Sequence, residues 1–329
     1  MKVLMYEGIG RMEIEEVKKP SGGTLIKVLG CGICGTDLKT FLNGHHFFKP
    51  PTVLGHEFYG KVEKTETEGL NEGDLVCVAP YFECGKCIIC KDGFPELCNN
   101  KNYVSSGAFA QYVSVPTNYE KGIFKIPTKE IEKKLWKVFT LVEPLACVLN
   151  GISHLHIKLS SRILIVGGGP MGVLFALYFQ QKKIPVSIVE PNPLRSEVLK
   201  SWGMHCISPE EIENGSYDNI VISVNIEKLV NEYLLKVKDG GTILIFSGLK
   251  KGTTVSLDTH SLHYRQVLVT GSCGFASEHF KKAFEMISEN PDHYVKLITK
   301  EMPLEKGIEA FNLLQSGKAF KIILNPWEK

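Results

Sequence analysis

Arginine and long blocks of like charge are scarce in this sequence. Arginine occurs only at Arg11, Arg162, Arg195 and Arg265, and the formal net charge is +2. Proteins that bind nucleic acid through its phosphates carry clustered positive charge, which this chain lacks. We therefore expect no nucleic-acid partner.

The sequence also lacks an export signal at its start and an uninterrupted membrane-spanning segment. Residues 1–6 contain no basic region followed by a long apolar stretch. The longest uncharged run, residues 163–181, is interrupted by Gly-Gly-Gly-Pro at 167–170, which predicts a buried strand, turn and helix. We expect no membrane partner.

Cysteine is not scarce, but its distribution does not suggest a secreted disulfide framework. Four of the ten cysteines fall within residues 84–98 at metal-ligand spacing. Disulfide frameworks are typical of short secreted chains, whereas this chain has 329 residues. The pattern predicts a reducing, cytoplasmic compartment.

The hydrophobic pattern predicts two regions of different architecture. Up to about residue 147, short strands such as 24–29 and 74–78 are separated by glycine-rich turns, so this half is mainly β. From about residue 160, apolar strands alternate with helical stretches, which predicts a parallel sheet with helices on both faces. The expected strands are 162–166, 186–189, 219–223, 242–247 and 267–270. Helical spacing over 277–288 and 304–315 predicts that two helices close the chain.

A glycine motif between a predicted strand and helix indicates a dinucleotide site. Gly167, Gly169 and Gly172 fit G-x-G-x-x-G, with Pro170 and Met171 between the last two. Gly167 permits a tight turn, Gly169 lets backbone amides approach a pyrophosphate, and Gly172 lets the helix pack close to the strand. The alternative is a glycine turn without a ligand, which the strand, turn, helix and second strand together disfavour.

The second strand of this unit ends in an acid that favours NAD. Glu190 lies eighteen residues after Gly172, near the offset at which a carboxylate meets the adenosine ribose. Its charge would repel a 2′-phosphate, although the nearby Arg195 leaves NADP as the alternative. We expect NAD as cofactor.

The four clustered cysteines predict a structural zinc site. Cys84, Cys87, Cys90 and Cys98 follow C-x₂-C-x₂-C-x₇-C, and two-residue gaps let successive thiolates face one tetrahedral centre. Four cysteines leave no open coordination position, so this metal would order the loop rather than react. Disulfides and an iron–sulfur cluster are the alternatives.

A second, open metal site is indicated earlier in the chain. Cys34 and, 22 residues later, the pair His56 and Glu57 supply a thiolate, an imidazole and a carboxylate. That ligand set suits zinc with one position left for substrate. An isolated cysteine or histidine is usually a packing or structural residue, so the prediction rests on the three together.

In order along nearly the whole chain, these motifs resemble the medium-chain zinc-containing alcohol dehydrogenases, and most of all the sorbitol, threonine and sugar dehydrogenase branch. The motifs are GICGTD at 32–37, GHE at 55–57, the four cysteines, EPLA at 143–146 and GGGPMG at 167–172. Five ordered motifs make chance agreement very improbable.

The resemblance implies roles for several side chains. Cys34 and His56 correspond to ligands of a catalytic zinc, completed by Glu57 or by Glu143, and this choice stays open. Thr36 corresponds to the hydroxyl that receives the substrate proton. Asp37 corresponds to an acid that holds the histidine ligand.

Three departures from the family pattern affect the proton path and the substrate. Where many relatives have a histidine five residues after the cysteine ligand, this chain has Lys39, so Lys39, His45 and His46 are all candidates to release the proton. The connection from Cys98 to Phe109, which helps form the substrate pocket, is short. The stretch 221–225 also departs from the pattern, and Asn225 is expected near the nicotinamide ribose.

The fold implied is α/β, with a GroES-like, partly open β-barrel and a Rossmann doubly wound parallel sheet. The catalytic domain would comprise 1–147, completed by 274–329, and the NAD-binding domain 148–273. The activity implied is zinc-dependent hydride transfer from a secondary alcohol of a polyol or sugar to NAD, with two zinc ions per chain, in a homodimer or homotetramer. A threonine-type amino-alcohol dehydrogenase and a non-catalytic zinc- and nucleotide-binding regulatory protein are the alternatives.

Overall fold

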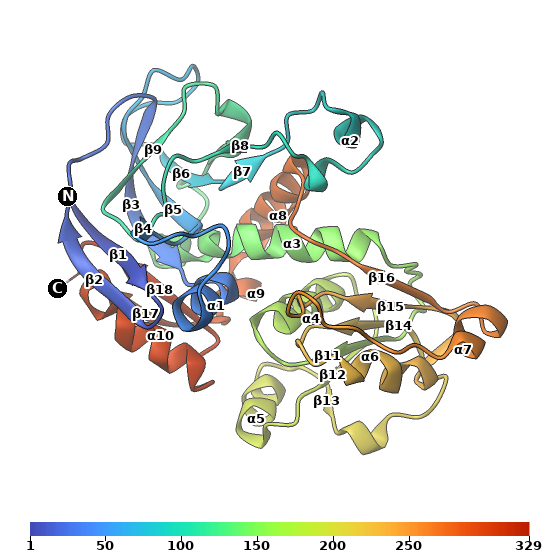
Figure 1. Cartoon of the computed structure of the whole chain (residues 1–329). Helices are drawn as coiled ribbons and strands as arrows, with labels where there is room; N and C mark the ends of the chain where they lie inside the picture. Colours follow the sequence, from blue (N-terminus) through green and yellow to red (C-terminus); the bar gives the residue numbers. More distant parts are fainter. Residues whose placement is uncertain (329) are drawn as a thin grey trace. The chain divides into compact units, whose positions relative to one another are not determined.

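The structure is a computed structural model that describes residues 1–328, and the chain divides into two compact units (Figure 1). Unit 1 comprises Met1–Ala146 and Phe275–Lys329, and unit 2 comprises Cys147–Gly274. Each unit has its own main sheet and its own hydrophobic core.

Unit 1 is built on a seven-stranded sheet of order β10-β6-β5-β3-β18-β17, in which β9 also pairs with β3. Its strands are β3 (Thr24–Gly32), β5 (Glu57–Lys64), β6 (Leu75–Val78), β9 (Tyr112–Val115), β10 (Ile123–Lys125), β17 (Ile298–Pro303) and β18 (Lys321–Asn325). Two smaller sheets contain β1 (Lys2–Gly8), β2 (Arg11–Glu16) and β4 (Thr52–Val53), and β7 (Tyr81–Phe82) with β8 (Asn102–Tyr103).

The core of unit 1 lies against one face of β3 and β5. Ile26 and Val28 are fully buried in it, whereas Lys27 between them faces the other side, as the two-residue period of a strand requires. Helix α10 (Gly307–Gln315) covers this core with Phe311, whose ring centroid lies 5.1 Å from that of Phe41 on α1 (Gly35–Asn43).

The end of the chain differs from the sequence prediction. Helices form at α8 (Ser277–Glu289) and at α10, but the prediction that two helices close the chain is wrong, because β17 and β18 also form there. Strand β18 runs parallel to β17 and antiparallel to β3. Its apolar run is too short for a period to distinguish a strand from a buried helix.

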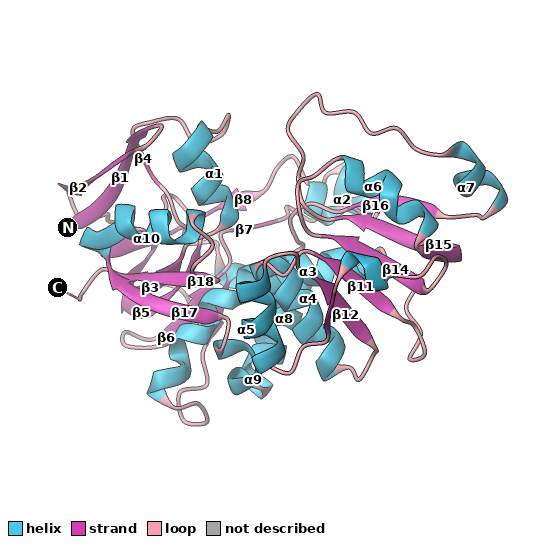
Figure 2. Cartoon of the chain, turned by 90° about the horizontal axis from the view of Figure 1, so that it is seen from below, coloured by secondary structure: helices cyan, strands magenta, loops and turns pink. Residues whose placement is uncertain are grey.

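Unit 2 is a six-stranded parallel sheet of order β13-β12-β11-β14-β15-β16 (Figure 2), which confirms the predicted parallel α/β architecture. The strands are β11 (Ile163–Val166), β12 (Val186–Val189), β13 (Cys206–Ile207), β14 (Tyr217–Ile222), β15 (Val237–Ile245) and β16 (Leu268–Gly271). The chain adds β12 and β13 on one side of β11 and then β14 on the other. Ligands of such sheets bind beyond the carboxyl ends of the strands where the order reverses, which is at β11 and β14.

Helices and short 3₁₀ segments connect these strands. The other helices are α2 (Ile88–Lys91), α3 (Val142–Ser153), α4 (Pro170–Gln181), α5 (Pro193–Ser201), α6 (Lys228–Glu232), α7 (Thr259–Tyr264) and α9 (Pro291–Val295). The 3₁₀ segments are η1 (Pro95–Leu97), η2 (Glu120–Gly122), η3 (Lys133–Leu141), η4 (Pro209–Glu211), η5 (Tyr233–Leu235) and η6 (Leu304–Lys306).

One helical stretch, Lys133–Ser153, is long and apolar enough to cross a membrane by length and composition alone. Inside the protein, however, 83% of its apolar window is buried. The core helix of a globular protein has the same properties, so this stretch is weak evidence for a membrane span.

Replacing Phe311 by alanine is predicted to lower the free energy of unfolding by about 3–5 kcal/mol, because the fully buried ring leaves a cavity between α10 and the sheet. Ile308→Ala on the same helix is the matched control. Ile308 is 41% exposed, so its truncation should cost about 0.5 kcal/mol or less. Urea unfolding of both variants measures the difference, and equal midpoints would contradict the assigned packing.

Candidate functional site

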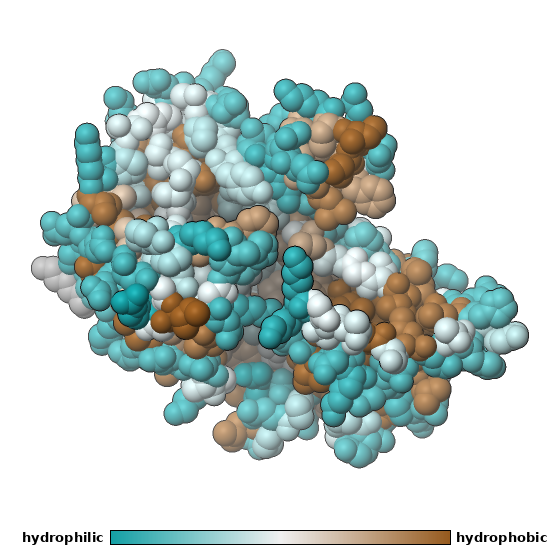
Figure 3. Space-filling view, in the orientation of Figure 1, coloured by the Kyte–Doolittle hydropathy of each residue, from teal (hydrophilic) through white to brown (hydrophobic). Residues whose placement is uncertain are grey.

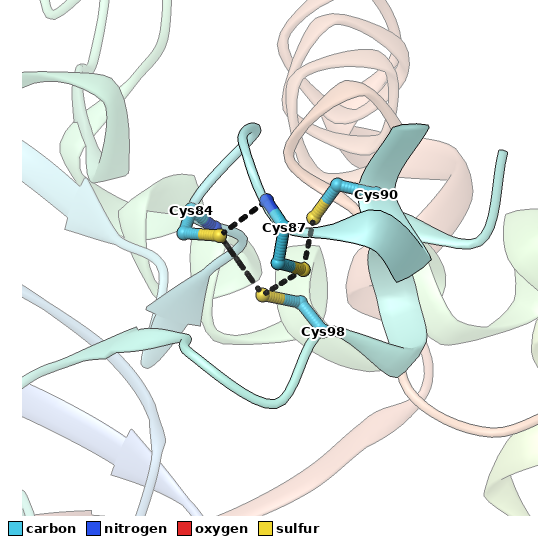
Figure 4. Close-up of side chains that lie close together, drawn as sticks. All are labelled: Cys84, Cys87, Cys90 and Cys98. Atoms are coloured by element: carbon cyan, nitrogen blue, oxygen red, sulfur yellow. Dashed lines mark hydrogen bonds between the residues drawn. The ribbon is translucent and has the colours of Figure 1, made fainter. Parts of the chain in front are cut away.

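Four cysteine sulfurs converge in the loop between β7 and β8 (Figure 4). The Sγ of Cys87 lies 3.4 Å from that of Cys90 and 3.7 Å from that of Cys98, and the Sγ atoms of Cys98 and Cys84 are 3.5 Å apart. A disulfide needs sulfurs at about 2.05 Å. A tetrahedral zinc with bonds of about 2.3 Å separates its sulfurs by about 3.8 Å. The arrangement therefore fits one zinc ion and not two disulfides.

Backbone groups shape the turn of this loop and lower the pKa of one of its cysteines, and both effects favour binding of a metal ion. Gly85 adopts φ +69°, a left-handed conformation that turns the chain between the first two cysteines. The amide groups of Lys86 and Cys87 lower the pKa of Cys84 to about 6, so this sulfur is readily a thiolate. With four protein donors the site is closed, which suits a structural role.

Cys34, His56 and Glu57 form a second group in unit 1. Their donor atoms all lie within 4.8 Å of one another. Cys34 caps the N-terminus of α1 and Glu57 begins β5, so two adjoining elements present the thiol, the imidazole and the carboxylate together. With a thiolate, an imidazole and a carboxylate as donors, the group fits zinc and leaves coordination positions open.

The carboxylate of Asp37 contacts both the Cys34 and the His56 side of this group. Its carboxylate is fully buried and accepts hydrogen bonds from the amides of Cys34 at 3.0 Å and Gly55 at 3.3 Å. It also lies 3.6 Å from His56 Nδ1. Burial opposes protonation of His56, but Asp37 and Cys34 outweigh it and raise the pKa of His56 well above its usual value. Because a metal binds the neutral imidazole and the thiolate, metal affinity must fall as the pH falls.

Lys321 is a residue of this site that sequence reasoning missed. Its Nζ donates to both oxygens of Glu57, at 2.8 and 2.7 Å, and to the carbonyl of Ile33 at 3.2 Å. Lys321 and Glu57 are 2% and 1% exposed. Burial opposes the charge of Lys321, but Glu57 and Cys34 outweigh it and raise the pKa of Lys321, so the pair is ionic. The available signal was a single lysine in an otherwise apolar strand.

The other residues expected at this site lie at different distances from it. Glu143 lies in the first turn of α3 and is 8% exposed. It is near enough to Lys321 to help raise the pKa of Lys321, but it is not part of the 4.8 Å group. The amide of Thr36 donates to Cys34 Sγ at 3.4 Å. Lys39 is exposed on α1. The pKa of His45 is lowered mainly by burial and further by the neighbouring charges of His46 and Lys39.

Unit 2 carries the glycine turn after β11. Gly167 adopts φ +107°, and a Cβ at Gly172 would lie 2.0 Å from the carbonyl oxygen of Gly167, so a larger residue at 172 would force the turn apart. At Gly169 a Cβ would meet nothing within 4 Å. Helix α4 begins after Gly169 with Pro170 at its first position and without a side-chain cap, which leaves amide donors for an anion. The turn therefore fits a pyrophosphate.

Glu190 lies against this turn. One of its oxygens accepts from the amide of Gly168 at 2.9 Å, and the other accepts from the amide of Asn192 at 2.9 Å. Arg195 Nη1 lies 3.6 Å from the same carboxylate. The structure thus joins Glu190 and Arg195 at the turn. Met171 is partly buried in α4, and Asn225 is exposed just beyond β14.

Ser223 is a second residue that the sequence reasoning missed. Its hydroxyl donates to the carbonyl oxygens of Val166 at 2.9 Å and Gly167 at 3.1 Å, and so links the end of β14 to the glycine turn. A serine at the end of a predicted strand is a common feature, and nothing in its local sequence distinguished it.

Known proteins share these features over the whole chain. Residues 20–128 match the alcohol dehydrogenase GroES-like domain. The chain is 30% identical to an L-threonine 3-dehydrogenase of Pyrococcus abyssi, over 98% of this chain and 97% of that protein. The chain belongs to the medium-chain zinc-containing alcohol dehydrogenase family.

Other members of the family support the same assignment. A D-altritol 5-dehydrogenase of Agrobacterium fabrum is 26% identical over 97% of both chains. A solved structure of a zinc-binding dehydrogenase from Sinorhizobium meliloti, bound to NADP, superposes with a TM-score of 0.87 at 25% identity over 99% of both chains. The predicted GroES-like and Rossmann folds are confirmed, and the protein is an alcohol dehydrogenase that uses zinc and NAD(P).

Replacing Cys98 by serine is predicted to remove one equivalent of zinc per chain and to expose residues 84–103 to proteolysis, because a hydroxyl is a poor substitute for a thiolate ligand. Cys206→Ser is the control, since Cys206 lies on β13 outside both groups. Metal analysis and limited proteolysis are the measurements. Unchanged zinc content in Cys98→Ser would contradict the closed site.

Replacing Lys321 by methionine is predicted to lower the stability of the metal-free protein by about 3–5 kcal/mol, because Glu57 is left buried without its cation. The double variant Glu57→Gln/Lys321→Met should recover most of this loss. Denaturant unfolding with and without zinc also addresses the choice of ligand. If Glu57 binds the ion directly, added zinc should restore most of the stability that Lys321→Met loses. If Glu143 is the ligand instead, Lys321→Met should stay less stable even with zinc.

Proposed function

We propose that this dehydrogenase oxidises a secondary alcohol group of a polyol or sugar at the centre formed by Cys34, His56 and Glu57. The observation that carries the proposal is that these donors lie within 4.8 Å of one another and leave open coordination positions. Relatives that act on such compounds include the D-altritol 5-dehydrogenase and a sorbitol dehydrogenase of Halalkalibacterium halodurans, which is 26% identical over 99% of both chains.

The side chains around this centre hold the ion and move a proton. A bound zinc ion supplies Lewis-acid activation of the alcohol, and a bound nicotinamide supplies the hydride acceptor. Cys34 and His56 hold the ion, and Asp37 orients His56 through the close approach at 3.6 Å. Thr36 takes the proton of the substrate hydroxyl, and Lys39, His45 and His46 are the candidates that pass it to water.

The third protein ligand, beside Cys34 and His56, is a carboxylate, either Glu57 or Glu143, and the Lys321→Met experiment distinguishes the two. Each oxygen of Glu57 accepts one hydrogen bond from Lys321, so an ion bound by Glu57 would share this carboxylate with a buried ion pair. Glu143 is buried and lies near enough to Lys321 to help raise its pKa, but it is not part of the 4.8 Å group. The four cysteines of the β7–β8 loop hold a second, structural zinc, which gives two ions per chain.

NAD is the proposed acceptor, and Glu190 is the residue that favours it. Its carboxylate is held at the glycine turn by the amides of Gly168 and Asn192, where the adenosine ribose of a dinucleotide lies in such folds. A 2′-phosphate would meet this negative charge. Arg195 lies against the same carboxylate, and Glu190 offsets its positive charge.

An amino-alcohol substrate is the second candidate. The L-threonine 3-dehydrogenase of Pyrococcus abyssi shares 30% of its residues with this chain, compared with 26% for the D-altritol enzyme. The metal centre serves both reactions, because each oxidises a secondary alcohol. The two differ in the charged amino and carboxyl groups that threonine carries.

A homodimer or homotetramer formed through β16 is also proposed. This strand ends the sheet of unit 2, so one of its edges has no partner strand within the described residues. None of its residues is buried, and Leu268 is 45% exposed, whereas every residue of β11 is buried. Figure 3 shows hydrophobic residues gathered over this part of unit 2. A second copy would cover the edge.

A reducing compartment, the cytoplasm, is proposed for the protein. Its support is chemical: none of the ten cysteines forms a disulfide in the structure, and nine of the ten are buried or partly buried.

The test is NADH formation over a panel of polyols, sugars and L-threonine, with NADP as the alternative acceptor. The proposal predicts turnover with NAD and at least one polyol or sugar. Cys34→Ala should lose one equivalent of zinc and all turnover while its circular dichroism stays unchanged, because the open site loses its thiolate.

Cys273→Ala is the matched control, because Cys273 is exposed and belongs to neither metal-ligand group. It should keep both zinc ions and full turnover. Turnover with L-threonine alone would favour the second candidate. Full turnover of Cys34→Ala would remove this residue from the reaction.

A further inference from the structure

A pocket with lysine and aromatic walls lies on the outer face of the sheet of unit 1. Its volume is about 290 Å³, and it is lined by Lys27, Tyr59, Lys61, Lys133, Trp136 and Trp327, among others. These residues come from β3, β5, η3 and the end of the chain. None of them belongs to either metal-ligand group or to the glycine turn, so the proposed reaction leaves this pocket without a role.

The two indole rings of the pocket are held in fixed positions. Trp136 Nε1 donates to the carbonyl of Ile131 at 3.1 Å, and Trp327 Nε1 donates to the carbonyl of Val28 at 2.6 Å. With the indole nitrogen satisfied by the backbone, each ring is held in place, and Lys27 lies over one face of Trp327. Flat, fixed aromatic surfaces favour stacking of a planar ligand.

The positive charge of the pocket has no counter-charge in contact with it. Lys27 and Lys61 lie directly opposite each other on β3 and β5, an arrangement in which like charges destabilise a strand pair. Among residues 1–328, no carboxylate lies within 4.0 Å of the amino groups of Lys27, Lys61 or Lys133. The Nζ of Lys27 lies 4.1 Å from the ring centroid of Trp327. An anion in the pocket would relieve this repulsion.

Tyr59 adds a hydroxyl donor to the lining of the pocket. The residue is only 8% exposed, and within the described residues its hydroxyl makes no hydrogen bond. Burial, assisted by Glu301 and Glu328, raises the pKa of Tyr59, so the hydroxyl keeps its proton and can donate. Glu301 is itself paired with Lys137 at 2.5 Å.

We propose that this pocket binds a small planar aromatic anion, in which one ring stacks on an indole and a phosphate, sulfonate or carboxylate group is held by the lysines and Tyr59. The volume restricts the ligand to about one ring, because pockets for drug-sized ligands begin at about 300 Å³. The site is independent of the catalytic centre and does not rest on the proposed reaction.

The experiment is calorimetric titration of the zinc-loaded protein with phenyl phosphate, in the presence of excess NAD so that the glycine turn is occupied. Phenyl phosphate should bind at least about tenfold more tightly than either inorganic phosphate or phenol, since only it uses both the charge and the ring. Binding should be unchanged in Cys34→Ala, which excludes phosphate bound at the open metal site.

Lysine variants locate the binding. Lys61→Gln should weaken phenyl phosphate binding by about tenfold through loss of a charge-assisted hydrogen bond. Lys64→Gln is the matched control, because Lys64 is exposed on the same strand and does not line the pocket. Tyr59→Phe removes only the hydroxyl and should also weaken binding. Lys133 lies at an exposed position of η3, so Lys133→Gln tests the loss of a second pocket lysine without changing the hydrophobic core.

Three results would overturn the proposal. The first is absence of heat at millimolar phenyl phosphate. The second is equal affinity for inorganic phosphate, which would show that the aromatic walls contribute nothing. The third is equal affinity of Lys61→Gln and Lys64→Gln, which would place the binding elsewhere.

Discussion

The metal centre of unit 1 is governed by an excess of buried negative charge. Asp37, Glu57 and Glu143 are each less than 9% exposed, and the Cys34 sulfur lies beside them. Burying several anions together is unfavourable unless cations accompany them. Lys321 supplies one positive charge and is held by both oxygens of Glu57. Asp37 and Cys34 raise the pKa of His56, so a protonated imidazole adds positive charge in the metal-free centre, and a divalent ion at the thiol and imidazole would replace it.

The two cysteine-containing groups suit zinc in different ways because their donor atoms differ. Four sulfurs from one loop enclose an ion completely, and the backbone amides that lower the pKa of Cys84 prepare that loop. The Cys34 group brings one sulfur, one imidazole and a carboxylate from two elements, so the ion keeps positions for an alcohol. A site closed by four cysteines orders its loop, whereas a site with an open coordination position can bind and activate an alcohol.

Much of the fold and part of the site could be read from local patterns. Five of the six parallel strands of unit 2 were predicted, because each is a short apolar run in alternation with helical stretches, whereas the two-residue strand β13 was missed. The chain terminus was misjudged, because Lys321–Asn325 is a five-residue run whose strand character depends on its pairing with β3 and β17. Such pairing is a property of distant residues and leaves no period in the sequence.

The sequence by itself determined the candidate residues for the chemistry, because cysteines at two-residue gaps, a glycine turn after a strand and an ordered set of family motifs are local features. Only the tertiary structure decided what those residues meet. Glu57 and Lys321 are separated by 264 positions, and Ser223 reaches the glycine turn across 56. The lysine and tryptophan pocket likewise joins segments from both ends of unit 1. Contacts of this kind depend on how the chain folds back on itself, which spacing along the sequence does not encode.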